Sequence, residues 1–220
     1  MSDDRYTPAQ ASAVANLPLK AVHKLIDSRL IRPERRVKGR EPQRLLSRAH
    51  LVYLRLEAEG VRLLPLASRR EVARAVEAQP DLDTMTVTGG GALVIAVRSA
   101  RRAVDQELAR LRKIQQMVVS DPEIMRGTPV FRGTRIPVEL VADMLAQGAS
   151  EQEILEGYVA LSREQVKAAP LYMKAFPRRG RPLRQPWSGQ KPIRVAEFPR
   201  RPPRPRGAAW RDRGIAPFTV

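Results

Sequence analysis

The last fifth of the chain most constrains the fold, because its composition opposes a packed core. Residues 174–220 hold 13 Lys and Arg, 2 Asp and Glu, and 9 of the 19 prolines. A segment so charged and so rich in proline buries too little apolar surface to offset the entropy cost of ordering it. We therefore expect this C-terminal tail to be extended or to fold only against a partner, and residues 1–173 to supply the compact fold.

The charge of the chain is unevenly distributed and points to an anionic partner. The net charge is +17, of which residues 1–79 carry +7, residues 80–120 carry +2, residues 121–173 carry −3 and residues 174–220 carry +11. An excess of Lys and Arg at both ends predicts binding to a polyanion, with nucleic acid as the first expectation.

Composition also excludes several classes of protein. The chain has no Cys, which excludes a disulfide scaffold, a thiolate zinc site and a cysteine nucleophile. Its two His leave little room for a histidine metal site, so we expect no metal and no other cofactor. The sequence lacks the run of roughly 18 apolar residues that a membrane span needs. Its acidic start, Ser2-Asp3-Asp4, lacks the apolar segment of a signal peptide. We therefore expect a cytoplasmic protein with no membrane partner.

The N-terminal region has the pattern of two short helices joined by a tight turn. Thr7, Pro8 and Gln10 predict a capped helix start, and this first helix should run to about Ala15. A second helix is predicted from about Leu19 to Ser28. The second helix should turn Val22, Leu25 and Ile26 inward. The arrangement fits a helix-turn-helix whose second helix reads DNA.

A basic hairpin is predicted directly after these helices. Residues 32–44 hold six basic side chains around Lys38-Gly39-Arg40, which would form the tip, and Ser47 should cap the next helix. The alternative is a solvated basic face on an ordinary helical bundle. On the first interpretation, the residues expected to contact operator DNA are Lys20, His23, Lys24, Arg29, Arg35, Arg36, Lys38 and Arg40.

This order of elements resembles the winged helix-turn-helix of the MerR regulators. The likeness rests on Tyr6-Thr7-Pro8 at the start and on Leu30-Ile31 after the second helix. It implies that residues 1–79 form a DNA-binding domain. Because one recognition helix covers only one half-site, it also implies at least a homodimer.

The middle of the chain has the pattern of a hairpin and a helix that link the two ends. Ser68 and Glu71 predict a capping box that opens a helix to Gln79. Two β-branched runs, 84–88 and 92–97, flank Gly89-Gly90-Gly91 and predict a β-hairpin. A helix should follow over 99–116. We expect residues 80–117 to link the ends and to contribute to the dimer interface.

The most specific motif lies in residues 121–173, the segment with a net charge of −3, which we call the acidic block. It begins with Asp121-Pro122, continues through Gly127-Thr128-Pro129-Val130, and ends with Gly133-Thr134-Arg135-Ile136-Pro137-Val138. The glycines predict turns of a hairpin bounded by Pro129 and Pro137. Three helices should follow, the second capped by Ser150 and the third by Ser162, with Pro170 inside the third. The result would be a compact domain like a helix-turn-helix.

On these residues, the segment 118–173 resembles a bacterial domain family associated with VapB-like antitoxins of type II toxin–antitoxin pairs. The resemblance implies a PIN-like ribonuclease toxin as partner. Because this domain has a net charge of −3, we expect it to serve dimerisation or toxin binding, with a second DNA contact as the alternative. Arg135 should stabilise its own fold by hydrogen bonds.

The tail combines apolar anchors with arginines, as a segment that wraps a protein does. Arginines that reach the carboxylate cluster of a PIN-like nuclease would block it. Arg179-Gly180-Arg181-Pro182 resembles the core of an AT-hook, so minor-groove contact by Arg179 and Arg181 is one alternative, and a solubilising tail is another. The residues expected to bind toxin are Trp187, Arg194, Phe198, Arg200, Arg204, Trp210 and Arg211.

Together these patterns predict a mainly α-helical protein with short β-hairpins and an extended tail. The carboxylates have no His at a catalytic spacing, so we expect no enzyme. The expected function is that of an antitoxin that neutralises a PIN-like ribonuclease through its tail and represses its own operon, as a homodimer and in a larger complex with toxin. The alternatives are a MerR-like regulator without a toxin, whose acidic block senses a ligand, and a metal-dependent nuclease.

Overall fold

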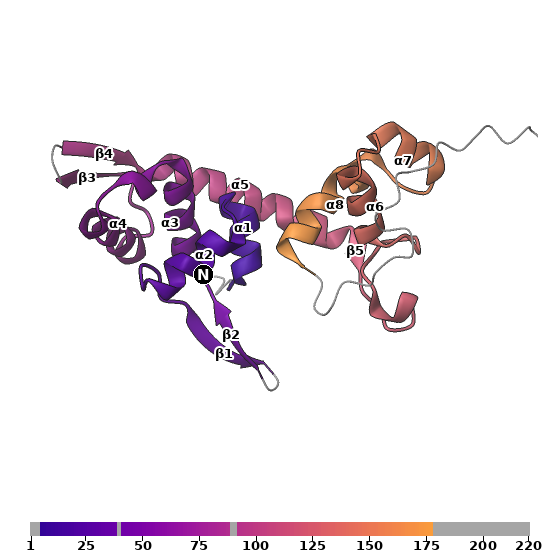
Figure 1. The fold of residues 1–220 in the computed structure, drawn as a ribbon, viewed down its shortest axis with the longest axis horizontal. Coiled ribbons are helices and arrows are strands. Elements are labelled where there is room, and N and C mark those ends of the chain that lie inside the picture. The colour runs from indigo at the N-terminus through magenta and orange to yellow at the C-terminus, as the bar shows by residue number, and fades with distance from the viewer. Residues whose placement is uncertain (1–4, 39–40, 89–91, 178–220) are drawn as a thin grey trace, which may run out of the picture. The chain divides into compact units, whose positions relative to one another are not determined.

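The structure is a computed structural model that describes residues 5–38, 41–88 and 92–177. The described part is mainly helical, with eight α-helices and three separate two-stranded antiparallel sheets (Figure 1). The expected class, mainly α with short β-hairpins, is thereby confirmed. None of the described helices is long and apolar enough to cross a membrane.

The first two helices, α1 (Pro8–Ala15) and α2 (Leu19–Asp27), form as predicted. The Thr7 hydroxyl accepts from the backbone N–H of Gln10 and the Gln10 side chain accepts from that of Thr7, which completes the capping box. Asn16 ends α1 in the left-handed conformation, with φ of 54°. Helices α2, α3 (Arg48–Glu59), α5 (Val97–Gln116) and α8 (Arg163–Ala175) all pack on α1. This short helix is therefore the centre of the first core, the buried cluster that includes Val14, Val22 and Leu54.

The basic hairpin consists of β1 (Glu34–Lys38) and β2 (Glu41–Leu45). Immediately after it, Leu46 pairs with Tyr6 through two backbone hydrogen bonds of 2.9 and 2.8 Å, so the chain start is tied to the base of the hairpin. Ser47 then caps α3 as predicted, with His50 as its partner at the third helical position.

The helix predicted to have Ser68 as its N-cap begins three residues earlier. It runs as α4 (Leu66–Ala78) after the short helix η1 (Val61–Leu63). Pro65 occupies the N-cap position in extended conformation, and Ser68 is buried inside the helix, so the predicted capping box does not form. A proline just before a helix forces the preceding backbone out of the helical region, and here that constraint sets the start.

The central hairpin forms as predicted and leads directly into a long helix. Strands β3 (Thr84–Thr88) and β4 (Ala92–Ala96) pair in register, with Thr86 opposite Val94. Helix α5 (Val97–Gln116) begins two residues before the expected position and buries Val104, Leu108 and Leu111. Arg48 of α3 pairs with Asp105 of α5, so the helix is tied to the first core by charge as well as by packing.

A buried polar network crosses the first core. The carboxylate of Glu57 accepts a hydrogen bond from the Tyr53 hydroxyl and two from Arg69, at 2.9 and 3.0 Å. Burial, together with this hydrogen bond, raises the pKa of Tyr53, which therefore stays a donor. The network fixes α3 against α4, since Arg69 comes from α4 and the other two from α3.

The acidic block has a second core. Phe131, Val141, Ile154 and Val166 are buried in it. Its sheet pairs β5 (Val118–Val119) with β6 (Val130–Phe131). Helix α8 contains Pro170 as predicted and runs past residue 173 to Ala175. Ser150 and Ser162 cap their helices in complete capping boxes. The elements are β5 (Val118–Val119), η2 (Met125–Gly127), β6 (Val130–Phe131), α6 (Val138–Ala146), α7 (Glu151–Gly157) and α8 (Arg163–Ala175).

The segment 127–138, which we call the signature, forms a wider loop and not the tight hairpin that the sequence predicts. Val130 pairs in the sheet with Val119, on the far side of η2, and Pro137 adds only an isolated bridge to Val130. Gly127 and Gly133 do adopt positive φ, at 81° and 79°. The prediction of glycine turns is therefore confirmed, but the first glycine closes a loop that contains η2 and not a tight hairpin turn.

Candidate nucleic-acid interface

The exposed face of α2 is basic. Lys20, His23 and Lys24 are exposed, whereas Val22 and Ile26 are buried in the core. This division agrees with the one that the spacing of the apolar residues predicts. The exposure of His23 is also what its predicted contact with DNA requires.

Arg29, two residues after the last residue of α2, adopts a conformation that usually requires glycine. Its φ is 58°, its N–H donates to Ile26 O at 3.0 Å, and the N–H of Leu30 donates to Leu25 O at 3.1 Å. These two bonds define a Schellman cap whose left-handed position is normally glycine. An arginine there costs of order 1 kcal/mol. Its exposed side chain is the group that a glycine would lack.

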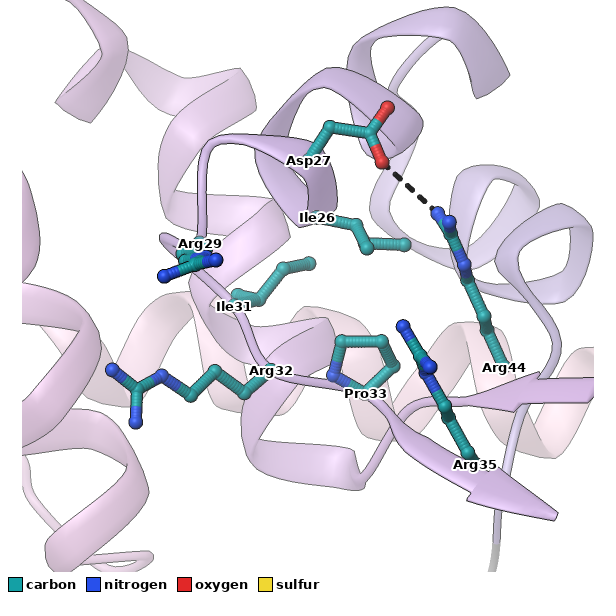
Figure 2. Close-up of a pocket in the computed structure, with 8 residues that line it drawn as sticks. All are labelled: Ile26, Asp27, Arg29, Ile31, Arg32, Pro33, Arg35 and Arg44. Carbon is teal, nitrogen blue, oxygen red and sulfur yellow. Dashed lines mark hydrogen bonds and ion pairs between the residues drawn. The ribbon is translucent and has the colours of Figure 1, made fainter.

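A groove lies between the end of α2 and the basic hairpin (Figure 2). It has a volume of about 470 Å³ and is open to solvent. We call it the α2–hairpin groove. Its lining residues are Ile26, Asp27, Arg29, Ile31, Arg32, Pro33, Arg35 and Arg44.

The register of the hairpin brings two arginines to one face of it. Arg35 of β1 lies directly opposite Arg44 of β2. Both side chains extend alongside each other toward the end of α2, where Arg44 Nη1 donates to Asp27 Oδ1 at 3.0 Å (Figure 2). Like charges opposite each other destabilise a strand pair, and Asp27 offsets this by neutralising one of them.

A second ion pair holds the base of the hairpin. Arg5 Nε and Nη2 donate to the two carboxylate oxygens of Glu34 at 2.8 and 2.7 Å. The hydrogen bond from Arg5 lowers the pKa of Glu34. With the Tyr6–Leu46 bridge beside it, this bidentate pair fixes where the hairpin leaves the core.

Most of the cations on this surface have no counter-charge. Among the residues that the structure describes, Lys20, Lys24, Arg29, Arg32, Arg35 and Arg36 make no ion pair. The arginines that hold the core together do have partners, as Arg48 has Asp105 and Arg69 has Glu57. Unpaired cations on one surface leave their full charge available to an anion.

The structure brings together part of the predicted site and adds to it. Lys20, His23, Lys24, Arg29, Arg35 and Arg36 lie on α2, its end and β1. Lys38 ends β1, and Arg40 lies outside the described residues. Asp27, Arg32 and Arg44 line the groove but are absent from the set that the sequence predicts. The signal for Arg44 is its place opposite Arg35, which requires the register of the hairpin.

The tail residues predicted to bind toxin or the minor groove lie outside the described residues. These are Arg179, Arg181, Trp187, Arg194, Phe198, Arg200, Arg204, Trp210 and Arg211.

Arg135 of the signature does not play the role expected of it. It is exposed, and among the described residues it has no hydrogen-bond partner. Its neighbour Arg132 donates instead, from Nε to Gln116 O at 2.8 Å. Arg132 directly follows β6 and its side chain reaches the end of α5, whereas Arg135 lies beyond the turn at Gly133.

The acidic block has a strained loop beside a cavity. Met125 and Arg126 adopt φ of 50° and 56°, directly before Gly127. Ser120 Oγ donates to Gly127 O at 2.6 Å and holds the loop closed. The adjacent cavity has a volume of about 490 Å³ and is lined in part by Ser120, Arg126, Glu139 and Tyr172. Within the described ranges, no group of three or more His, Asp or Glu is placed to hold a metal ion.

Comparison with known proteins found relatives for parts of the chain. Among curated proteins, the chain is 39% identical over 89 residues to the "Uncharacterized protein y4eO" of Sinorhizobium fredii, a match that covers 40% of each chain. The chain thus spans about two fifths of that relative's length.

Two solved structures are also similar. One is a DUF433 member protein from Anabaena variabilis, 36% identical over 34% of this chain and 75% of that one, with a TM-score of 0.26. The other is Rv2018 from Mycobacterium tuberculosis, 17% identical over 75% of this chain and 96% of that one, with a TM-score of 0.28. Residues 118–173, which contain the Gly-Thr-Arg-Ile-Pro-Val signature, match the family described as "Protein of unknown function (DUF433)".

Proposed function

We propose that the protein is a DNA-binding regulator and the antitoxin of a type II toxin–antitoxin pair. In this proposal, residues 1–79 bind operator DNA through α2 and the basic hairpin. The observation that carries it is the group of unpaired cations around the α2–hairpin groove. The neutralised toxin is a PIN-like ribonuclease, bound by the tail.

The shape of the basic surface supports DNA as the anion. An α-helix fits the major groove of B-DNA, and Lys20, His23 and Lys24 lie on the face that α2 exposes. Arg29 and Arg35 line the groove at the end of that helix, where they are free to contact phosphates. Asp27 lies among them, but its negative charge is neutralised by the ion pair with Arg44.

The antitoxin part of the proposal is supported by the signature domain and by the composition of the tail. The domain has a net charge of −3, which disfavours phosphate contact. The tail places Trp187, Phe198 and Trp210 among 13 basic residues. Proline-rich, extended backbone lowers the cost of ordering such a segment, and its aromatic residues supply burial against a folded partner.

DNA binding is tested by a salt series on the protein's own promoter. Lys20, Lys24 and Arg29 are replaced together by Ala. The slope of log K against log salt should fall by about 0.9 for each phosphate that the variant no longer neutralises. The matched control replaces Arg74, Arg102 and Arg163, which are exposed, lie on α4, α5 and α8, and likewise lack an ion pair in the described part of the chain. Equal losses of affinity in both triple variants would show nonspecific attraction and contradict the proposed surface.

Toxin neutralisation is tested with fragments. The product of the adjacent reading frame, which this proposal expects to be a small acidic PIN-like protein, is co-expressed. Its ribonuclease activity is assayed with residues 1–177 or residues 178–220. The cut follows α8, which ends at Ala175. We expect the first fragment to keep promoter binding without inhibition and the second to inhibit at least in part. Full inhibition by residues 1–177 would move toxin binding to the signature domain.

A second candidate is a regulator without a toxin, and the cavity beside Arg126 favours it. Its lining combines Arg126, Glu139 and Tyr172 with apolar groups, as small-molecule sites do. Backbone strain at Met125 and Arg126 is also typical of ligand sites. If co-expression and size-exclusion chromatography yield no complex with the adjacent gene product, this candidate replaces the antitoxin.

A further inference from the structure

The central hairpin differs in composition from the rest of the chain. Charged residues make up 29% of the protein, yet residues 84–97 contain none. Edge strands of monomeric proteins are usually protected by Lys, Pro or inward-pointing charges. Strand β4 has none of these protections, and within the described residues it pairs with β3 alone.

One part of the hairpin is packed and another is open. Val87 and Ile95 are buried against the first core. Val94 is 66% exposed and Leu93 is 46% exposed, so two large apolar side chains on β4 remain accessible to solvent. Figure 1 shows the hairpin extending beyond α4. Packing of this kind stabilises a two-stranded sheet, and it leaves the outer edge of β4 unpaired in the described structure.

A mainly apolar groove adjoins β4, with Glu59 and Ser99 as its polar lining residues. Its volume is about 320 Å³, and Leu56, Val61 and Leu64 form its wall opposite the strand. Leu93 and Val94 line it from the side of β4. The unpaired edge and the groove together form a surface suited to an added strand.

The sequence of β4 identifies the strand that fits. It reads Ala92-Leu93-Val94-Ile95-Ala96, which is nearly the same in both directions. We propose that β4 pairs antiparallel with β4 of a second copy of this chain, centred on Val94. Leu93 would lie opposite the partner subunit's Ile95, Ala92 opposite the partner subunit's Ala96, and Val94 opposite Val94 of the partner subunit.

Symmetry explains why the strand carries no charge. In a twofold contact the same patch meets itself, so a residue on the axis faces its own copy. Any charge at position 94 would be repelled by an identical charge. The alternation of faces is also preserved, because Leu93 and Ile95 lie on the same side of β4, the side that faces the core. The product is a four-stranded sheet in the order β3, β4, β4 and β3.

This inference goes beyond the proposed function and does not depend on it, because it rests on β4 and the groove beside it. The sequence predicts a homodimer and places residues 80–117 at its interface. The strand edge is the part of that region with an unpaired, self-complementary surface in the described structure. If the protein did not bind DNA, the pairing of β4 would still stand. If the protein were a monomer, the salt series would still measure its phosphate contacts.

The test uses the full chain with a substitution at Val94, the residue on the proposed twofold axis. Val94→Lys and Val94→Glu should each shift the mass in light scattering at micromolar concentration from two chains to one. An equimolar mixture of the two variants should recover the two-chain mass, since Lys then faces Glu. Val159→Lys is the control, because Val159 is 88% exposed and lies outside the hairpin. Circular dichroism should show the same helix content in all of them.

A crosslink tests the register. The chain has no Cys, so Val94→Cys introduces a single thiol. Directly opposed residues of an antiparallel pair have Cα atoms about 4.5–5.5 Å apart, which a disulfide spans. Oxidation should link Val94→Cys chains rapidly and Val159→Cys chains no faster than random collision. The proposal is overturned if wild type is a monomer, if Val94→Lys remains a dimer, or if the two Cys variants crosslink at the same rate.

Discussion

Arg35 and Arg44 lie directly opposite each other across the β1–β2 hairpin, and only Arg44 has a partner in the described residues, Asp27 at 3.0 Å. The pair therefore presents about one unneutralised positive charge toward the groove. Because Asp27 ends α2, the same bond sets the hairpin against the helix proposed to enter DNA. This exposed ion pair thus adds to the Arg5–Glu34 pair and the Tyr6–Leu46 bridge in placing the surface.

Replacing Asp27 with Asn should tighten DNA binding. The change removes a carboxylate from the surface and frees Arg44, so the salt slope should rise by about 0.9, as expected for one more neutralised phosphate. Stability should fall by at most about 1 kcal/mol, as is typical of an exposed ion pair. The control is Asp105→Asn, which breaks the pair with Arg48 away from the groove. Equal effects of the two variants on the slope would refute the assignment.

Replacing Arg29 with Gly should separate stability from binding. Glycine relieves the left-handed backbone at φ of 58°, and we expect a gain of about 0.5–1 kcal/mol in the free energy of unfolding in urea. DNA affinity should fall, since the cation is removed. Asn16→Gly relieves a similar φ of 54° in a residue that carries no charge, so it should leave affinity unchanged. Unchanged promoter binding by Arg29→Gly would remove Arg29 from the interface.

The capping box of α3 should make stability depend on pH. His50 Nδ1 accepts from the Ser47 N–H at 3.1 Å, so that nitrogen must be unprotonated. Burial lowers the pKa of His50, more than Glu77 at 3.6 Å from Nε2 raises it. Since the folded state binds this proton less readily than the unfolded state, the contribution is complete above about pH 6.5 and is lost as the pH falls below it.

The variant that tests this is His50→Gln. Glutamine completes a capping box at the same position but does not titrate. Between about pH 7 and about pH 5.5, a range that spans the ordinary pKa of histidine, the unfolding free energy of the variant should change less than that of wild type. Parallel pH curves for the two proteins would show that His50 is not the titrating group.

Glu57 should be the most costly of the core's charged residues to change. It is buried and accepts from Tyr53 and from two nitrogens of Arg69. Glu57→Gln leaves Arg69 without a counter-charge, which should cost about 3 kcal/mol in chemical denaturation. Glu59→Gln, which breaks the exposed pair with Arg55 on the same helix, should cost about 0.5 kcal/mol. Similar losses of stability for both would mean that the network adds little.

Local chemistry explains which elements are predictable from the sequence. The capping boxes at Thr7, Ser150 and Ser162 involve residues three apart, and all three form. The same pattern at Ser68 fails because Pro65, outside the box, sets the start of α4. A capping motif is thus reliable only where the preceding backbone leaves the N-cap position open.

The groove is less predictable, because it depends on pairing between distant segments. The basic residues of α2 follow from helical periodicity, but the contact between Arg44 and Asp27 requires the hairpin register. The Arg5–Glu34 pair joins residues 29 positions apart and has no local signal. Arg135 shows the converse, since its place in a specific motif does not give it a partner in the described structure.

The central claim, that α2 and the hairpin lie against DNA, is tested most directly by proximity cleavage. Because the chain has no Cys, single thiols can be placed at His23, at Val37, which is 72% exposed on β1, and at Val159, which is 88% exposed in the signature domain. Each is labelled with a DNA-cleaving iron chelate and bound to the promoter. We expect localised strand cleavage from positions 23 and 37 and background cleavage from position 159. Localised cleavage from position 159, with background cleavage from positions 23 and 37, would contradict the claim.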